Sequence, residues 1–406
     1  MSAQKPMRMA LYHNLPSGGG KRALYEWVRR LATKGVQFDV FTLDTADHDY
    51  CDIRPFARSH RVYAFKHKPL FRRPLGRLNK LQYWRDLLEV ERQGQTVARD
   101  IDAGGYDLVL VNPCVLSAVP GVLQFLKTPS LFYLHEPFGK KFIRPFYRAY
   151  LNYGPVHAIA DGLDPFIAGY DRQLERMRAA GLRAATRVLA NSQFTRQVIA
   201  REYGVQARVC YLGVSTTDFA PDDTVHRQSH VLSVGEGAPR KGHDFLIESL
   251  AHLPQASRPV LRLAANYEFR YETAHLNHLA DKHKVSLEIR MKLNTAQLAD
   301  EYRSACMLVY SPVLEPFGLA PLEAMACGTA VVAVKEGGVC ETVLHNETGL
   351  LVERNPEQFA QAMQSLLDAP ARCQQLGRTG RDIVVKQWNW DESVRHLEIE
   401  LADFNP

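Results

Sequence analysis

Short apolar runs of the kind that form buried strands alternate with helical segments along the whole chain. Six runs lie in the N-terminal half, starting at residues 9, 38, 107, 130, 187 and 209. Six more follow, starting at residues 231, 261, 287, 307, 330 and 349. Apolar runs separated by helices indicate βαβ units and parallel sheets. Two successive sets therefore predict an α/β protein with two doubly wound domains.

A turn-rich segment from Gly213 to Val225 separates the two sets of strands. The length of 406 residues also suits two domains. We therefore expect an N-terminal domain over residues 1–213 and a C-terminal domain over residues 214–387. The last segment, from Trp388 onward, predicts a helix capped by Asn389 or Asp391, because an apolar face follows these residues.

Composition places the chain among ordinary globular proteins, with 46% hydrophobic and 23% charged residues. The seven cysteines are scattered without a C-x-x-C pair, which favours reduced thiols over metal ligands or a disulfide framework. No run reaches the roughly 18 apolar residues of a membrane span. The first run, residues 9–15, is too short for the apolar region of a signal peptide. These observations favour a cytoplasmic protein.

The net charge of +6 is unevenly distributed. Between Asp52 and Asp86 the chain has basic residues interleaved with aromatic ones and no acidic residue, and a second such stretch covers residues 138–148. Mixed basic and aromatic residues attract anions such as lipid headgroups. Two interpretations of these stretches stay open. They form a solvated basic face with buried aromatic anchors, or they bind peripherally to the anionic inner face of a membrane. Nucleic acid is not an expected partner.

The segment from Tyr310 to Val334 has the strongest chemical signal. A strand ends near Tyr310, a loop with proline and glycine follows, and a helix is predicted from Ala320 or Pro321 to Gly328. The loop therefore lies at the carboxyl ends of the strands, where open α/β sheets bind ligands. The peptide N–H groups of the residues before the helix can bind an anion; these residues are Phe317, Gly318 and Leu319.

Two carboxylates, Glu315 and Glu323, bracket this anion site. They could accept hydrogen bonds from the hydroxyl groups of a ribose or a sugar. Alternatively, Glu323 only favours the helix dipole and Glu315 is simply exposed.

Three other strand–turn segments carry candidate residues. Arg240 and Lys241 precede a predicted helix and could bind a diphosphate, although the spacing is not that of a P-loop. Gly19 and Gly20 follow the first strand, where a backbone without side chains can approach a ligand. His135 ends a later strand. The D-x-D pattern of residues 47–49 lies in a polar stretch without a strand and is attributed to chance, so no metal site is expected.

The residues from Glu315 to Glu323 resemble the Glu-x7-Glu signature of the retaining family-4 glycosyltransferases, the glycosyl transferases of group 1. Gly337-Gly338, Glu341 and the segment 346–352 continue the resemblance, which extends over nearly the whole chain. It implies a GT-B fold, in which two Rossmann-like domains face each other across a cleft. It also implies that the terminal helix, residues 388–406, crosses back onto the N-terminal domain and that the C-terminal domain holds the donor.

The resemblance also implies a role for each candidate residue. Glu323 would bind the ribose, Glu315 would face the donor sugar, and Lys241 would neutralise the diphosphate with Arg240 beside it. The N–H groups of Phe317, Gly318 and Leu319 would contact sugar and phosphate. Gly19 or Gly20 would let the N-terminal loop close over the phosphates, and His135 would lie on the acceptor side. Glu315, His135 and Lys241 are thus the catalytic candidates, and no cofactor or metal is expected.

One position departs from the family pattern. Glu236 stands where many members have an arginine, and a carboxylate beside a diphosphate would be repulsive. Arg240 could replace the missing charge, Glu236 could turn away, or donor binding could be weak.

The expected function is retaining transfer of a sugar from a nucleotide-diphosphate sugar to a hydroxyl group of a glycan or lipid-linked acceptor. The alternatives are a non-catalytic GT-B protein that binds nucleotide sugars, or another GT-B enzyme such as a phosphorylase or an epimerase.

Overall fold

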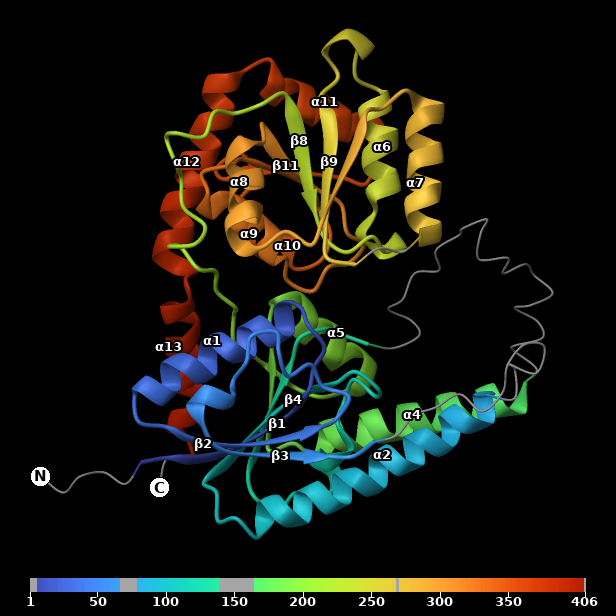
Figure 1. Cartoon of the computed structure of the whole chain (residues 1–406), viewed down its shortest axis with the longest axis vertical. Coiled ribbons are helices and arrows are strands. Elements are labelled where there is room, and N and C mark those ends of the chain that lie inside the picture. The colour runs from blue at the N-terminus through green and yellow to red at the C-terminus, as the bar shows by residue number, and fades with distance from the viewer. Residues whose placement is uncertain (1–5, 66–78, 139–163, 268–269, 405–406) are drawn as a thin grey trace, which may run out of the picture. The chain divides into compact units, whose positions relative to one another are not determined.

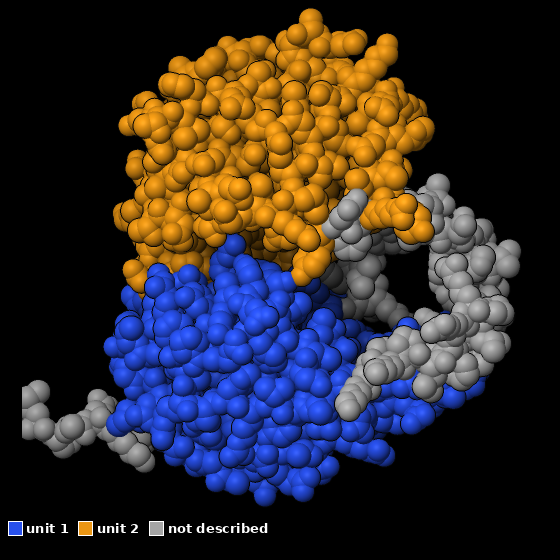
Figure 2. All heavy atoms as spheres, viewed as in Figure 1, with its two compact units in different colours: residues 1–143, 147–211, 393–406 blue, residues 144–146, 212–392 orange. Residues whose placement is uncertain are grey.

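A computed structural model describes residues 6–65, 79–138, 164–267 and 270–404 of the chain (Figure 1). These residues form two compact units, shown in different colours in Figure 2. The first unit contains the chain up to Tyr211 and returns at Ser393 for the C-terminal segment, and the second unit contains Leu212–Glu392. The boundary lies between Tyr211 and Leu212, directly before the turn-rich segment that begins at Gly213.

The first unit is built on a seven-stranded parallel sheet with the order β3-β2-β1-β4-β5-β6-β7. Its central strands are almost wholly buried. The strands are β1 (Arg8–Asn14), β2 (Gln37–Leu43), β3 (Ala57–Tyr63), β4 (Leu108–Cys114), β5 (Ser130–Leu134), β6 (Arg187–Ala190) and β7 (Arg208–Val209). The α-helices that accompany them are α1 (Gly19–Thr33), α2 (Asn79–Asp102), α4 (Pro165–Ala184), α5 (Gln193–Tyr203) and most of α13 (Trp390–Ala402).

Strand β3 was not predicted from the sequence. It lies inside the first basic stretch, and most of its side chains are exposed or half-buried because it is an edge strand. An edge strand with charged side chains is a common protection against pairing with other chains. Arg58 on this strand donates to the side chain of Gln37 at 2.8 Å, so part of the basic stretch belongs to the sheet.

The second unit is built on a six-stranded parallel sheet with the order β10-β9-β8-β11-β12-β13. All six strands coincide with the predicted apolar runs: β8 (His230–Val234), β9 (Val260–Ala265), β10 (Leu287–Met291), β11 (Met307–Tyr310), β12 (Val331–Val334) and β13 (Gly349–Val352). The α-helices are α6 (His243–Ala251), α7 (Arg270–His283), α8 (Thr295–Ser304), α9 (Leu319–Ala326), α10 (Val339–Thr342), α11 (Pro356–Leu367) and α12 (Pro370–Gln387). Short 3-10 helices occur in both units: η1 (Arg54–Phe56), η3 (Gly121–Gln124), η5 (Pro239–Lys241) and η6 (Gln255–Ser257).

The strand orders fix where each sheet can bind a ligand. In both sheets the chain first builds outward to one side and then returns to the centre to build the other side. The direction reverses between β1 and β4 in the first sheet and between β8 and β11 in the second. Ligands of open α/β sheets bind outside the carboxyl ends of the strands at this switch point. The loops after β1, β4, β8 and β11 are therefore the first places to look for a site.

The C-terminal helix α13 is anchored to the first unit by polar contacts. Ser393 of this helix accepts a hydrogen bond from the Trp27 indole at 2.9 Å and donates to the carbonyl of Tyr211 at 2.7 Å. Glu400 accepts from Arg187 at 3.0 Å and from Arg208 at 3.1 Å, at the end of the sheet where β6 and β7 pair. These bonds explain why the chain returns to the first unit after it has completed the second.

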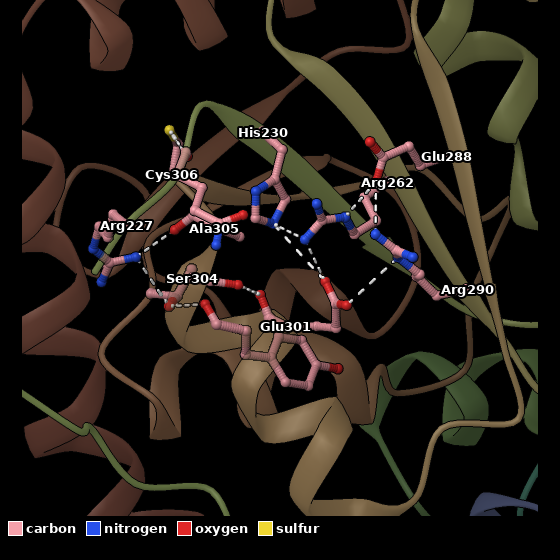
Figure 3. A network of polar contacts seen from close by, with 12 residues as sticks. Arg227, His230, Arg262, Glu288, Arg290, Glu301, Ser304, Ala305 and Cys306 are labelled. Atoms are coloured by element: carbon pink, nitrogen blue, oxygen red, sulfur yellow. Dashed lines mark hydrogen bonds and ion pairs between the residues drawn. The ribbon is translucent and has the colours of Figure 1, made fainter. Parts of the chain in front are cut away.

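An ion-pair network links strands β8, β9 and β10 to helix α8 (Figure 3). The Arg262 guanidinium lies 3.0 Å from Glu288 and 2.8 Å from Glu301, and Arg290 lies 3.1 Å from Glu288. His230, buried at the start of β8, contacts Arg262 at 3.3 Å, and burial lowers its pKa to about 4. The network therefore braces the second unit by tying these three strands to α8.

Candidate functional site

The loops that follow β8 and β11 bring together two residues that are far apart in the sequence. Lys241 ends the 3-10 helix η5 (Pro239–Lys241) directly before α6, and Glu315 lies in the loop before α9. The Lys241 ammonium donates to both carboxylate oxygens of Glu315, at 3.1 and 2.9 Å. Their side chains are only 13% and 17% exposed, so this ion pair is largely removed from water.

Glycines allow the loops around this pair to pack at backbone distance. A Cβ on Gly242, which has a φ of 67°, would lie 2.4 Å from the carbonyl oxygen of Ser311. A Cβ on Gly337 would lie 2.3 Å from the carbonyl oxygen of Glu315, and Gly338 donates its N–H to that same oxygen at 2.8 Å. The Gly337-Gly338 pair of the sequence therefore holds the backbone of Glu315 in place.

Arg354 braces the same loop from strand β13's side. Its guanidinium donates to the carbonyls of Ser311 and Pro312, at 3.0 and 2.9 Å, and forms an ion pair with Glu336 at 3.0 Å. Arg354 was not among the candidate residues of the sequence. It follows β13 closely, but nothing in the local pattern distinguishes it from an exposed arginine.

Two buried tyrosines hydrogen-bond to the two carboxylates of the Glu-x7-Glu pattern. The Tyr302 hydroxyl, from α8, donates to Glu323 at 2.8 Å, and both side chains are buried. The Tyr310 hydroxyl, at the end of β11, donates to Glu315. Burial would raise the pKa of Glu315, but the charges of Lys241 and Arg240 and the hydrogen bonds from Lys241 and Tyr310 together lower it below the ordinary value. Glu315 is therefore an ionised acceptor at neutral pH.

Helix α9 begins at the predicted anion site. It starts at Leu319, with Gly318 as its N-cap at a φ of 92°, and Gly328 follows its end at a φ of 71°. The predicted start at residue 320 or 321 differs by one or two residues. Phe317 is buried, and its ring centroid lies 5.8 Å from that of Trp388. The start of α9 thus lies between Glu315 and Glu323 in the sequence and carries the N-terminal partial charge of the helix dipole.

The unusual Glu236 is paired within its own turn. Its carboxylate lies 2.5 Å from the Arg240 guanidinium, and its carbonyl accepts a hydrogen bond from His243 at 3.2 Å. Burial lowers the pKa of His243 to about 4, so this histidine is neutral and can donate through Nε2 while Nδ1 accepts from Ser233. Arg240 therefore compensates the charge of Glu236 directly. This arrangement differs from the three possibilities that the sequence left open.

The first unit places Gly20 and His135 in contact. Gly20 lies in the first turn of α1, and a Cβ at this position would be 3.3 Å from the His135 ring. Gly19 is the first residue of the same helix. The His135 ring also packs against Tyr133, with centroids 4.8 Å apart, and its pKa is lowered to about 3 by burial. His135 is therefore a neutral imidazole that can accept or donate a hydrogen bond but carries no charge.

Two asparagines complete the surroundings of His135. The Nε2 of His135 lies 3.2 Å from Oδ1 of Asn112, and the Asn191 amide donates to the His135 carbonyl at 2.6 Å. Sequence reasoning did not single out Asn112. Its signal was available, because it is the first polar residue after the apolar run of β4, at the edge where ligands bind.

The predicted site residues thus fall into one cluster in each unit. The second unit brings together Lys241 and Glu315, with Arg240 and Glu236 on the preceding turn and Glu323 on α9. The first unit brings together Gly20 and His135, with Gly19 beside them. Asp47, the first acid of the D-x-D pattern, accepts hydrogen bonds from the backbone N–H groups of Asp49 and Tyr50 at 3.0 and 2.9 Å. This pattern is a turn, and the described part of the chain contains no group of acids, histidines or cysteines arranged to hold a metal ion.

Residues 66–78 of the first basic and aromatic stretch, and all of the second stretch after Phe138, lie outside the described residues. Within the described part, Phe65 is a buried anchor that packs with Leu43, Leu87 and Met177. No helix of the described residues is long and apolar enough to cross a membrane.

Two parallel doubly wound units with binding loops at the carboxyl edges of their sheets define the GT-B class of α/β enzyme. Residues 17–218 match the family described as Glycosyltransferase Family 4, and residues 214–383 match the family described as Glycosyl transferases group 1. The two matches overlap over residues 214–218 and together extend over most of both units. The chain belongs to this family of glycosyltransferases.

Individual relatives agree with this membership. The chain is 31% identical over 233 residues to the GDP-mannose-dependent alpha-(1-6)-phosphatidylinositol monomannoside mannosyltransferase of Mycobacterium tuberculosis, covering 52% of this chain and 60% of that protein. It therefore spans less than two thirds of that relative's length. It is 26% identical over 388 residues to D-inositol 3-phosphate glycosyltransferase 2 of Catenulispora acidiphila, covering 89% of this chain and 84% of that protein.

A solved structure shares the whole fold. The sucrose-phosphate synthase of Thermosynechococcus elongatus superposes with a TM-score of 0.73 at 22% identity, over 98% of both chains. At this identity the likeness establishes the GT-B fold and not the substrates.

Proposed function

We propose that the chain transfers a sugar from a nucleoside-diphosphate sugar to an acceptor hydroxyl group with retention of the anomeric configuration. The observation that carries this proposal is the buried pair of Lys241 and Glu315 beside the start of α9. Lys241 supplies a cation for a diphosphate, and Glu315 supplies an ionised carboxylate for sugar hydroxyl groups. Glu323 offers a second carboxylate for the ribose. In this proposal the N–H groups of Phe317, Gly318 and Leu319 contact the sugar and the phosphates.

The pairing suggests how the site changes when the donor binds. A diphosphate carries more negative charge than one carboxylate and competes for the Lys241 ammonium. Glu315 is then released as an acceptor for the donor sugar's hydroxyl groups. Arg240 is already paired with Glu236, so its contribution to phosphate binding is weaker than that of an unpaired arginine. Lys241 and the helix dipole then stabilise the charge that develops on the leaving diphosphate.

The proposed step is a displacement on one face of the sugar. The acceptor oxygen forms a bond to the anomeric carbon while the bond from that carbon to the diphosphate oxygen breaks. The proton of the acceptor hydroxyl moves to the departing phosphate oxygen. Positioning, and not a covalent enzyme intermediate, is the contribution of the protein. His135 lies on the acceptor side as a neutral hydrogen-bonding group.

Because Lys241 and the helix N-terminus supply the positive charge, we propose that transfer needs no divalent metal. Transfer activity that persists in excess EDTA supports this point. Activity that disappears in EDTA and returns with Mg²⁺ or Mn²⁺ contradicts it.

The activities named for the relatives support GDP-mannose, among nucleotide sugars, as a first donor to test, and inositol-containing phosphates or lipids as first acceptors. Thermal shifts with a panel of nucleoside diphosphates and their sugars select the donor. Lys241→Ala and Glu323→Ala should each abolish the shift that the nucleotide produces in the wild-type protein. A full shift in either variant overturns the site assignment, and binding without transfer to any acceptor favours a non-catalytic binding protein.

We also propose that the first unit contacts an anionic membrane surface, where a lipid-linked acceptor would be located. Helices α2 and α4 lie side by side (Figure 1) and run in the same direction, with Trp84 packed against Gly169. The N-terminal halves of these helices expose large apolar side chains, those of Leu81, Tyr83, Leu88 and Phe166. Arg85 and Arg172 are exposed on the same halves of the helices. Apolar side chains flanked by cations suit the interface of an anionic bilayer.

Vesicle sedimentation tests the membrane proposal. Binding to phosphatidylglycerol vesicles should fall as salt rises, and the double variant Leu81→Ser, Phe166→Ser should bind less than the wild type. Equal sedimentation with phosphatidylcholine vesicles contradicts the proposal.

A further inference from the structure

Asn112 combines complete burial with an amide nitrogen that lacks a hydrogen-bond partner. It lies near the end of β4, at the switch point of the first sheet, and is 0% exposed. Its Oδ1 is 3.2 Å from Nε2 of His135. Its Nδ2 has no hydrogen-bond partner among the residues that the structure describes. A buried N–H group without a partner is destabilising, so its presence at a ligand-binding edge calls for an explanation.

The contact with Asn112 determines which nitrogen of His135 carries the proton. A neutral imidazole has one N–H group and one lone pair on its two nitrogens. Because the amide oxygen of Asn112 can only accept, the proton of His135 must be on Nε2. Nδ1 is then the acceptor. Burial keeps the ring neutral, with its pKa lowered to about 3.

The rest of the surroundings hold the ring without competing for Nδ1. Tyr133 packs against the ring at a centroid distance of 4.8 Å, and Asn191 binds the backbone carbonyl of His135 and not the ring. The absence of a Cβ on Gly20 leaves room beside the ring, since a Cβ there would be 3.4 Å from Nδ1. Asn112 is therefore the residue that selects the tautomer.

We infer that Asn112 is a positioning residue that fixes His135 as the Nε2–H tautomer, so that Nδ1 accepts a hydrogen bond from a sugar hydroxyl group. The inference rests on the proposed function for its ligand, a sugar substrate. The tautomer itself follows from the amide oxygen of Asn112 facing Nε2 of the ring. This separation lets the two be tested independently.

The tautomer is measured by ¹⁵N NMR of protein labelled at histidine, with the His135→Gln variant identifying the signals of His135. The wild type should show the Nε2–H form. Asn112→Leu, which has a similar size but no acceptor, should lose this preference, and Asn112→Ser provides a milder change if the leucine variant fails to fold. Asn191→Leu is the matched control, because it removes a bond to the His135 backbone and should keep the Nε2–H form.

Activity gives a second readout that a purely structural role would not move. Asn112→Asp places a carboxylate at Nε2 and raises the pKa of His135, so turnover should fall toward acidic pH with a midpoint above that of the wild type. Asn112→Leu should lower turnover at least tenfold, whereas its affinity for the nucleoside diphosphate should stay within twofold of the wild type.

A His135 that remains in the Nε2–H form in Asn112→Leu overturns the inference, and so does an Asn112→Asp variant with the pH profile of the wild type. If the wild type transfers no sugar from any donor, the proposed function fails. In that case the NMR result still decides whether Asn112 selects the tautomer.

Discussion

Replacing Lys241 by methionine should strongly destabilise the second unit in the absence of any ligand. The methionine keeps the length and most of the packing of the lysine stem but removes the charge. Glu315 is then left as a largely buried carboxylate, since its side chain is 17% exposed. It retains the hydrogen bond from Tyr310 and the more distant charge of Arg240.

Removal of one partner from a buried ion pair typically costs about 3–5 kcal/mol. Because Tyr310 and Arg240 still compensate part of the charge of Glu315, we expect the lower end, about 3 kcal/mol. For a unit of about 150–250 residues, 1 kcal/mol corresponds to roughly 2–4 °C in Tm. The midpoint of the second unit's transition should therefore fall by about 6–12 °C.

Differential scanning calorimetry measures this change, with the transitions of the two units fitted separately because a two-unit chain need not unfold in one step. Lys335→Met is the matched control. Lys335 lies 3.8 Å from Glu353 in the same unit, and both side chains are exposed. An exposed pair contributes about 0–1 kcal/mol, so the control should shift Tm by no more than roughly 4 °C.

The pH dependence gives an independent check. The pKa of Glu315 is lowered from 4.5 in the folded chain, so the stabilisation by the pair is complete above pH 4.5 and is lost as the pH falls through the lower folded value. The midpoints of the wild type and of Lys241→Met should therefore converge on acidification below pH 4.5. If Lys241→Met and Lys335→Met shift Tm equally at neutral pH, the pair is not buried as described and the reasoning is refuted.

Three further variants test separate parts of the structure. Tyr302→Phe removes the hydrogen bond to Glu323 and should weaken nucleoside-diphosphate binding about tenfold in calorimetric titration; unchanged affinity would mean that Tyr302 does not orient this carboxylate. Gly20→Ala crowds the His135 ring and should lower turnover without changing nucleotide affinity, whereas wild-type turnover would contradict the contact. His230 has its pKa lowered from 6.5 to about 4, so the unfolded chain binds a proton that the folded chain does not, and stability should fall by up to about 1.4 kcal/mol per pH unit as the pH drops through that window. His230→Gln should reduce the change of unfolding free energy with pH, measured by denaturant titrations. If this pH dependence is unaltered, it arises from other groups.

The fold was largely predictable because buried parallel strands leave continuous apolar runs. All six strands of the second sheet coincide with such runs. Strand β3 was not predicted because it is an edge strand. Arg58 and Arg61 occupy exposed positions on it, so its sequence does not show a continuous apolar run.

The candidate site was predictable in position but not in its pairings. The strand–loop–helix pattern located Glu315 and Lys241 at the carboxyl edge. The ion pair between them forms because two loops pack together, and the two residues are 74 positions apart in the sequence. A local sequence pattern does not predict such a contact. Tyr302 and Asn112 were missed for a related reason. Each looks like an ordinary core or strand-end residue until the partner that it positions is known.

The most direct test of the account is a crystal structure of the protein with the nucleoside diphosphate that gives the largest thermal shift. The account predicts the ribose hydroxyl groups at Glu323 and the diphosphate at the start of α9, with the Lys241 ammonium moved from Glu315 to a phosphate oxygen. A nucleotide bound elsewhere, with the pair of Lys241 and Glu315 intact, would contradict it.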